Sequence, residues 1–242
     1  MFPGIGTLIN VVAIIAGSIL GKFGGNRIPE RTRTLVTEIL GAITLISAAA
    51  SLRSLWDQEL IEVTPQGSPI LIVLTSLIFG ALIGSALNLE NRLISLGEYL
   101  KRKLGSSNGI FVEGFVAASL VFAIGPLAIL GSISDGMKTG IDQLLLKSTL
   151  DFFAAIAFAA AFGWGVLFSF LPVGIYQASW TALGFGLGNV LSDAQVSAMT
   201  SVGGVLLIGI GLRLLNLRNI AVANILPALL IAPLLTQFIS QI

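Results

Sequence analysis

The stretch DFFAAIAFAAAFGWGVLFSFL, residues 151–171, decides the fold of this chain. It holds a single charged residue, Asp151, and shows no alternation of apolar with polar side chains. A strand of a transmembrane barrel would alternate in that way, whereas a helix that crosses lipid needs about 20 mostly apolar residues. A helix also satisfies its backbone hydrogen bonds within the segment. The stretch therefore predicts a membrane-spanning helix.

The rest of the chain has the same character. Of its 242 residues 55% are hydrophobic and only 10% are charged, and the mean hydropathy is +0.97. A soluble domain of this length and composition would expose too much apolar surface to water. Apolar segments long enough to span lie at 5–23, 35–55, 69–88, 110–133, 147–170, 173–191, 194–215 and 219–240. The sequence predicts an all-α polytopic membrane protein that forms a single membrane domain over residues 1–242. It has about eight spans, and a count of seven is the alternative.

The basic residues predict the orientation. They gather in the first, third and seventh connections: Lys22, Arg27, Arg31 and Arg33; Arg92, Lys101, Arg102 and Lys103; Arg213 and Arg218. The second connection is acidic instead. The positive-inside rule then places the odd connections in the cytoplasm and both termini outside, in a multi-pass protein of the cell inner (plasma) membrane. The net charge of +1 gives no reason to expect a nucleic-acid partner.

The chain has neither Cys nor His. Disulfides, thiolate nucleophiles and His-bound metals are thus excluded, and no glycine-rich phosphate loop is recognisable. We expect no cofactor and no metal, and an ATP-driven pump would need a second polypeptide. Energy coupling within this chain would have to use ions or gradients.

Residues 90–104 form a predicted amphipathic helix at the cytoplasmic membrane surface. An apolar stripe recurs at helical spacing through Leu89, Leu93, Leu96, Leu100 and Leu104, and charged residues occupy most of the remaining face. Such a helix could be a plain connector or could sense lipid.

Small-xxx-small glycine pairs predict close helix packing. They are Gly17 with Gly21, Gly80 with Gly84, and Gly184 with Gly188. The contacts could join helices of one chain or of two copies, so a homo-oligomer stays open.

Two predicted spans carry proline. Pro126, preceded by Gly125, interrupts the fourth span, and Pro227 interrupts the last. Broken backbone hydrogen bonding at membrane depth is tolerated where it faces a packed core or a wet cavity, and transporter sites are often built at such breaks. A packing kink and a binding site both remain open.

Polar residues near these breaks are the candidates for a solute or ion site. Lys147 and Asp151 are four residues apart, hence on one helical face, where they form either a functional polar pair or a solvated pair at the surface. The full set of candidate binding residues is Asn10, Ser132, Asp135, Lys147, Asp151, Gln177 and Asn224.

An internal repeat is also indicated. Aligning residues 28–52 with 191–215 places Glu30 opposite Asp193 and Gly41 opposite Gly204. The match equates the second span with the seventh, so the two copies would cross the membrane in opposite senses, as in inverted-repeat transporters.

Segments 114–136, 144–166 and 202–229, with their Gly-Pro, Ser-x-x-Asp-Gly and Lys-Ser-x-x-Asp elements, resemble the bacterial membrane-protein family called domain of unknown function 554. The opening GTLINVVAIIAGSILG, residues 6–21, is similar too. The resemblance implies a polytopic inner-membrane protein, sometimes labelled a transporter. Its recurring polar positions would map onto Asn10, Ser132, Asp135, Lys147, Ser148, Asp151, Gln177 and Asn224, and it implies no catalytic residue.

Three functions follow from these observations. The first is a secondary transporter or channel for a small solute or ion, with its site between the broken fourth helix, the start of the fifth and the eighth. The second is a non-transporting membrane scaffold or assembly partner that uses the glycine pairs and the amphipathic helix. The third, an intramembrane enzyme with a Ser–Lys dyad, fits poorly because adjacent Lys147 and Ser148 point about 100° apart on a helix. We expect the chain not to be an enzyme.

Overall fold

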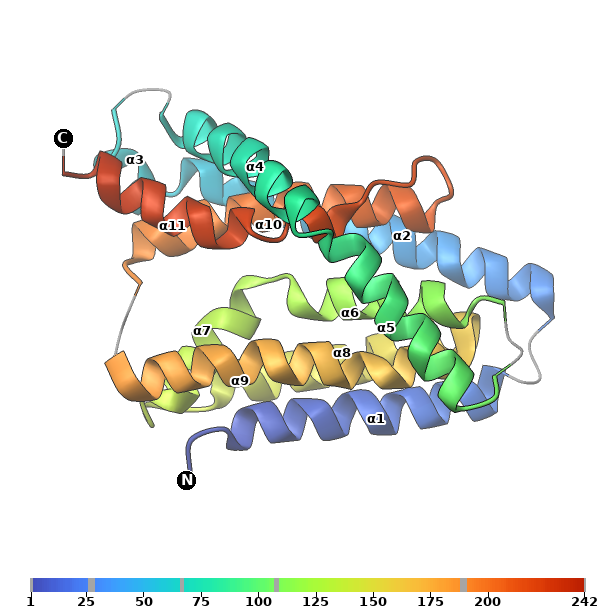
Figure 1. The fold of residues 1–242 in the computed structure, drawn as a ribbon. Coiled ribbons are helices and arrows are strands. Elements are labelled where there is room, and N and C mark those ends of the chain that lie inside the picture. Colours follow the sequence, from blue (N-terminus) through green and yellow to red (C-terminus); the bar gives the residue numbers. More distant parts are fainter. Residues whose placement is uncertain (1, 26–28, 66–67, 107–108, 188–190, 242) are drawn as a thin grey trace. The chain divides into compact units, whose positions relative to one another are not determined.

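The computed structural model describes residues 2–25, 29–65, 68–106, 109–187 and 191–241, and over these residues it is helical (Figure 1). The α-helices are α1 (Ile5–Gly25), α2 (Glu30–Leu52), α3 (Gln58–Glu62), α4 (Ser68–Ala86), α5 (Leu89–Lys103), α6 (Phe111–Ala123), α7 (Pro126–Gly136), α8 (Asp142–Phe162), α9 (Phe170–Leu187), α10 (Asp193–Leu214) and α11 (Ala228–Ile239). Three 3-10 helices join them: η1 (Arg53–Trp56), η2 (Gly163–Ser169) and η3 (Val222–Ile225).

The predicted fold class, a polytopic all-α membrane protein, is confirmed. Among the described residues six helical stretches are long and apolar enough to cross a membrane, or seven if the bent pair α6 and α7 forms one span. One of the six is the 45-residue stretch Asp142–Gly186, which contains the fifth predicted span and most of the sixth.

That long stretch reverses direction at η2. Along α1, the positions Gly6, Gly17 and Gly21 meet Leu144, Phe152 and Ile156 in turn, so α1 and α8 run parallel. Thr7 meets Thr181 and Asn10 meets Gln177, so α9 runs antiparallel to α1. Gly163, with φ of +79°, begins the turn between α8 and α9. Counting α8 and α9 separately brings the total to the predicted seven or eight.

The chain divides into two compact units. The first comprises Met1–Leu40 and Ile94–Val190, and the second comprises Gly41–Leu93 and Leu191–Ile242.

Glycine permits a close helix contact between α1 and α8 in the first unit. A methyl group at Gly17, Gly21 or Gly25 of α1 would collide with the backbone of α8 at Phe152, Ile156 or Ala160. The two helices can therefore approach backbone to backbone, as membrane helices with small residues do.

Glycine also permits close helix contacts in the second unit. Gly80 and Gly84 of α4 lie against the backbone of Ala228 and Asn224, and Gly41 of α2 lies against Leu215 at the end of α10. Of the predicted glycine pairs, five members make such close contacts within the chain, and Gly188 lies outside the described residues.

The fourth predicted span is broken. α6 ends at Ala123, α7 begins at Pro126, and the two helices are bent by 63°. Gly125 adopts φ of +152°, a backbone conformation that a side chain would strain. The last predicted span is interrupted as well, because η3 and α11 are separate helices with Pro227 between them.

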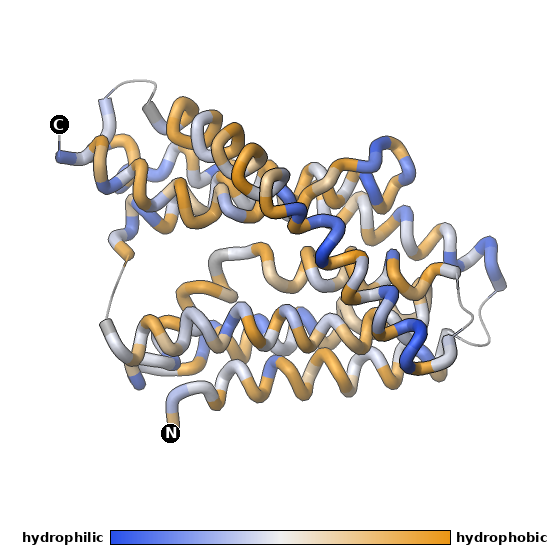
Figure 2. The backbone as a smooth tube through the Cα atoms, in the orientation of Figure 1, coloured by the Kyte–Doolittle hydropathy of each residue, from blue (hydrophilic) through white to orange (hydrophobic). Residues whose placement is uncertain are grey.

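α5 corresponds to the predicted amphipathic helix. Figure 2 shows hydrophilic turns along it, in contrast to the largely apolar α4 that precedes it. The helix ends with Lys101, Arg102 and Lys103 in its last turn, where cations complement the helix dipole.

Candidate functional site

α8 buries charged side chains and exposes large apolar ones. Lys147 and Asp151 are 7% exposed, whereas Leu150 and Phe153 are 55% and 64% exposed. The exposed apolar side chains suit contact with lipid, and the buried face turns Asp151 toward Asn10 of α1. Because α8 begins at Asp142, Asp151 is more than two turns into the helix. The pair is therefore a buried pair and not a solvated one.

Four side chains from three helices form the core of a polar cluster. Lys147 Nζ donates to Asp151 Oδ2 at 2.7 Å, and Asn10 Nδ2 donates to the same oxygen at 3.0 Å. Asn10 Nδ2 also lies 3.3 Å from Gln177 Oε1 of α9. We call Asn10, Lys147, Asp151 and Gln177, together with Asp135, the polar cluster.

The orientation of the two amides follows from the carboxylate. Asn10 must turn its NH₂ toward the Asp151 oxygen, and Gln177 must then present its oxygen to that NH₂. Asn10 Oδ1 and Gln177 Nε2 are left buried without a hydrogen-bond partner, and both residues are 0% exposed. One unused acceptor and one unused donor thus lie inside the cluster, where an unmet polar atom costs about 1–3 kcal/mol.

Asp135 enters the cluster from α7. Its Oδ2 accepts a 2.9 Å hydrogen bond from the backbone N–H of Gly6, in the first turn of α1, and the residue is 2% exposed. The partial positive charge of a helix N-terminus favours a carboxylate there. Next to Gly6, the Thr7 hydroxyl lies 3.3 Å from that of Thr181 on α9.

Ser132 makes a hydrogen bond within its own helix. Its hydroxyl is 0% exposed and donates to the Ala128 carbonyl of its own helix at 2.6 Å. Ser148 likewise donates to the Leu144 carbonyl at 2.6 Å. In these hydrogen bonds neither hydroxyl donates its hydrogen to a basic side chain that could activate it as a nucleophile.

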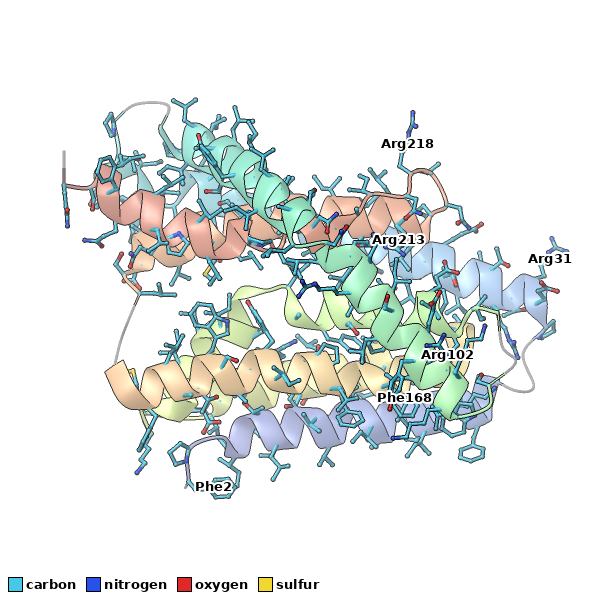
Figure 3. The ribbon with its side chains drawn as sticks, viewed as in Figure 1. Phe2, Arg31, Arg102, Phe168, Arg213 and Arg218 are labelled. Carbon is cyan, nitrogen blue, oxygen red and sulfur yellow. The ribbon has the colours of Figure 1, made fainter. Side chains whose placement is uncertain are left out.

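Asn224 lies in the second unit. Its Oδ1 accepts a 2.8 Å hydrogen bond from the backbone N–H of Glu90. Glu90 in turn accepts from Arg213 Nη1 at 2.6 Å and from the Ala223 N–H at 2.9 Å. Arg213 stands at the end of α10, whereas Arg218 extends from the following turn (Figure 3). Asn224 thus belongs to a network that holds η3, the segment before Pro227.

The structure joins Asn10, Lys147, Asp151 and Gln177 by hydrogen bonds. Asp135 binds α1 at Gly6, one turn before Asn10, and Ser132 lies on the same helix as Asp135. Sequence reasoning missed Gly6, Thr7, Thr181 and Glu90. Thr7 lies three residues before Asn10, so helical spacing could have found it. Glu90 was assigned to the solvated face of the amphipathic helix, yet it is 8% exposed.

The cluster can bind or relay small charged or polar species. It offers carboxylate and amide oxygens as acceptors and an ammonium and an amide NH₂ as donors. No group of three His, Cys, Asp or Glu suited to a metal ion occurs among the described residues.

Comparison with known proteins identifies relatives over nearly the full length. The family model described as "Protein of unknown function (DUF554)" matches residues 5–237. The chain is 31% identical over 233 residues to the "Uncharacterized protein YqgA" of Escherichia coli (strain K12), covering 94% of both chains. It is 31% identical over 229 residues to the "Uncharacterized membrane protein YdfK" of Bacillus subtilis (strain 168), covering 94% of this chain and 93% of that protein.

No solved structure matches the chain. The helical membrane architecture and the full-length family match lead to one conclusion, which is that the chain belongs to the DUF554 family of proteins of unknown function.

Proposed function

We propose that this protein is a secondary transporter or channel for a small solute or ion, and that the polar cluster is its site. The observation that supports this is the buried bridge from Lys147 to Asp151 to Asn10. A charged side chain at the centre of a membrane helix costs about 2.5–3.5 kcal/mol on insertion scales, and such residues commonly mark ion or solute pathways. A bundle needing only stability would be served by apolar residues.

The broken helix adds support. Asp135 and Ser132 both lie on α7, the half-helix that follows the break at Gly125. Substrate and ion sites of secondary transporters are typically assembled from discontinuous helices of this kind.

An inverted repeat forms part of the proposal, and the sequence register extends further than the second and seventh spans. The register that pairs Glu30 with Asp193 also pairs Leu20-Gly21 with Leu183-Gly184 and Gly25-Asn26 with Gly188-Asn189. It therefore equates α1 and α2 with α9 and α10 in the same order, with connections of similar length in the sequence. Transporters often consist of two such copies of opposite orientation.

The contacts within the second unit fit this register. A side chain at Gly41 of α2 would meet Leu215 and the Gly211 carbonyl, and one at Gly204 of α10 would meet Leu52 and the Ala48 carbonyl. The register pairs Gly41 with Gly204, Leu215 with Leu52 and Gly211 with Ala48. Each contact is thus the counterpart of the other, as across a two-fold axis.

In the first unit, α1 and α9 also pack antiparallel, as such an axis requires. Their polar residues differ, however, since Asn10 corresponds to Val173 and Gln177 to Ile14. The repeat would accordingly supply the framework, and one site has been built on it by divergence.

The remaining parts of the proposal concern location and chemistry. We place the chain in the inner membrane with its odd connections in the cytoplasm, because these carry the basic residues. We also propose that it is not an enzyme, because Ser132 and Ser148 donate their hydroxyl hydrogens to helix carbonyls. A non-transporting scaffold is the alternative, supported by the glycine contacts that bind the helices into tight units.

Reconstitution into proteoliposomes tests the proposal. Flux of inorganic ions is compared for the wild type, Asp151→Asn, and the double variant Lys147→Met with Asp151→Leu, which removes both charges and keeps the volume. We expect both variants to lose flux while the double variant keeps its size-exclusion profile. Wild-type flux in the folded double variant would exclude the pair from the mechanism, and a wild type without flux for any ion would favour the scaffold.

A further inference from the structure

We propose, building on the function above, that the polar cluster accepts a single positive charge, a monovalent cation or a proton, and that Asp135 is the carboxylate that receives it. The proposal rests on the charge balance of the first unit, on the unused amide oxygen of Asn10 and on the placement of Asp135 beside α1.

The buried charged side chains among the described residues of the first unit are Asp135, Lys147 and Asp151. Lys147 and Asp151 form a 2.7 Å ion pair, and neither described salt bridge of the chain includes Asp135. Two carboxylates with one ammonium leave the cluster with a charge of −1. The N-terminus of α1 contributes only about half a positive charge toward it.

A bound cation would restore neutrality in surroundings where an unmatched charge is costly. A divalent ion would overcompensate, and it usually takes several carboxylate or carbonyl oxygens. The cluster has only one carboxylate without a cationic partner, so a single charge is the better match.

The available atoms are the ligands that hard cations prefer. Asn10 Oδ1 is a fully buried carbonyl oxygen with no hydrogen-bond partner, and Asn10 lies one turn after Gly6, hence on the same face of α1. The hydroxyls of Thr7 and Thr181 lie between these positions along α1. An acceptor-rich surface therefore extends along α1 from the Asp135 carboxylate to the amide of Asn10.

Gly6 is the residue that lets the carboxylate approach. A methyl group at Gly6 would lie 2.5 Å from Leu144 Cδ1, 3.0 Å from Leu144 Cβ and 3.1 Å from Asp135 Oδ2. The 2.9 Å bond from the Gly6 N–H depends on that free space. The absence of a side chain at this position thus leaves room for both Leu144 and the Asp135 carboxylate.

The other titratable groups on the helices packed against α7 do not neutralise Asp135. On α8 they are Asp142, which is exposed, and the Lys147–Asp151 pair; on α9 there is Tyr176; on α1 there is Lys22, at the opposite end of the helix. Lys138 follows α7 but is exposed, with its Nζ over the ring of Phe185 at 5.6 Å.

Two measurements on the purified full-length protein test the inference. In the first, proteoliposomes on a solid support receive steps of sodium chloride, sodium gluconate, potassium gluconate, choline chloride or pH, and the transported charge is recorded. In the second, the melting temperature in detergent is measured across the same solutions. Asp135→Asn removes the charge and keeps the side-chain shape, and Asp135→Glu keeps the charge on a longer side chain. Asp142→Asn, at an exposed position, is the matched control.

We expect currents that follow the Na⁺, K⁺ or pH step and are indifferent to chloride. Asp135→Asn should reduce them by about tenfold or more, equivalent to about 1.4 kcal/mol of binding free energy, while Asp142→Asn should not. The cation that raises the melting temperature should be the one that carries current, and Asp135→Asn should lose that rise. Asp135→Glu supplies a charged variant if Asp135→Asn does not fold.

The outcomes separate this inference from the proposed function. Chloride-driven currents would overturn the cation assignment and leave transport standing. If no step gives a current, net charge transport by the cluster fails, and the melting measurement alone decides the cation site. A cation-dependent rise that Asp135→Asn removes and Asp142→Asn retains would still support the site. Identical behaviour of wild type and Asp135→Asn in both measurements would overturn it.

Discussion

Lys147 Nζ and Asn10 Nδ2 converge on one oxygen, Asp151 Oδ2, at 2.7 Å and 3.0 Å. That oxygen neutralises the lysine and ties α8 to α1. Asp151→Asn should therefore leave a buried ammonium without a counter-charge, and we expect the free energy of unfolding to fall by about 3 kcal/mol. Thermal unfolding in detergent measures the change.

A double variant separates charge from volume. Lys147→Met combined with Asp151→Leu should recover most of that loss, because apolar residues of similar size often replace a buried ion pair at little cost. Lys138→Met, at an exposed lysine, is the control and should leave the unfolding free energy within about 0.5 kcal/mol of the wild type. A double variant as unstable as the single one would mean that the pair is worth more to the fold than this reasoning allows.

Gly21 and Gly24 offer a matched test of helix packing. A methyl group at Gly21 would collide with the backbone at Ile156, whereas nothing lies within 4 Å of one at Gly24. Gly21→Ala should lower the free energy of unfolding by about 1–3 kcal/mol through overpacking. Gly24→Ala should be neutral or stabilising by up to about 1 kcal/mol, because Ala is the better helix former. Equal effects at both positions would show that α1 does not need this close approach.

Much of the fold could be predicted because the length and hydropathy of a local segment are enough to predict a membrane helix. Length and hydropathy found the apolar segments, and proline with glycine located the break between α6 and α7. The 3-10 segments η2 and η3 could not be predicted, because they arise where the chain turns against neighbouring helices. The residues before Pro227 mix polar and apolar side chains, and this pattern does not predict a 3-10 helix.

The site was predicted in part for a similar reason. A charged residue within an apolar segment stands out, so Asp135, Lys147 and Asp151 were recognisable from the sequence alone. Helical spacing indicates the pairing of Lys147 with Asp151. Their further partners depend on contacts between residues more than 100 positions apart, such as Asn10 with Asp151. Asn224 shows the limit, since its partner Glu90 lies on a helix whose composition indicated a solvated face.

The Glu90–Arg213 pair should stabilise the segment before α11. Its side chains are 10% and 15% exposed, and Glu90 also accepts the Ala223 N–H. In a double-mutant cycle with Glu90→Gln and Arg213→Met, we expect a coupling energy of about 1–3 kcal/mol. Glu98→Gln, an exposed glutamate of the same helix, paired with Arg213→Met should show no coupling. Coupling near zero for Glu90 would reduce the pair to an ordinary surface contact.

The natural absence of cysteine makes the inverted repeat directly testable. Glu30→Cys and Asp193→Cys introduce single thiols at exposed positions that the repeat register pairs, each at the first residue of its helix. In intact cells, a membrane-impermeant maleimide should label Asp193→Cys, and Glu30→Cys should react only after the membrane is opened. Each variant thereby serves as the permeability control for the other.

Opposite accessibility would follow from the antiparallel contact of α2 with α10 together with the basic first connection, which the positive-inside rule keeps in the cytoplasm. Reversed labelling, with Glu30→Cys reacting from outside, would preserve the inverted repeat and overturn the orientation. Labelling of both thiols from one side would remove the repeat, because related copies of opposite sense cannot begin their second helices on the same face of the membrane.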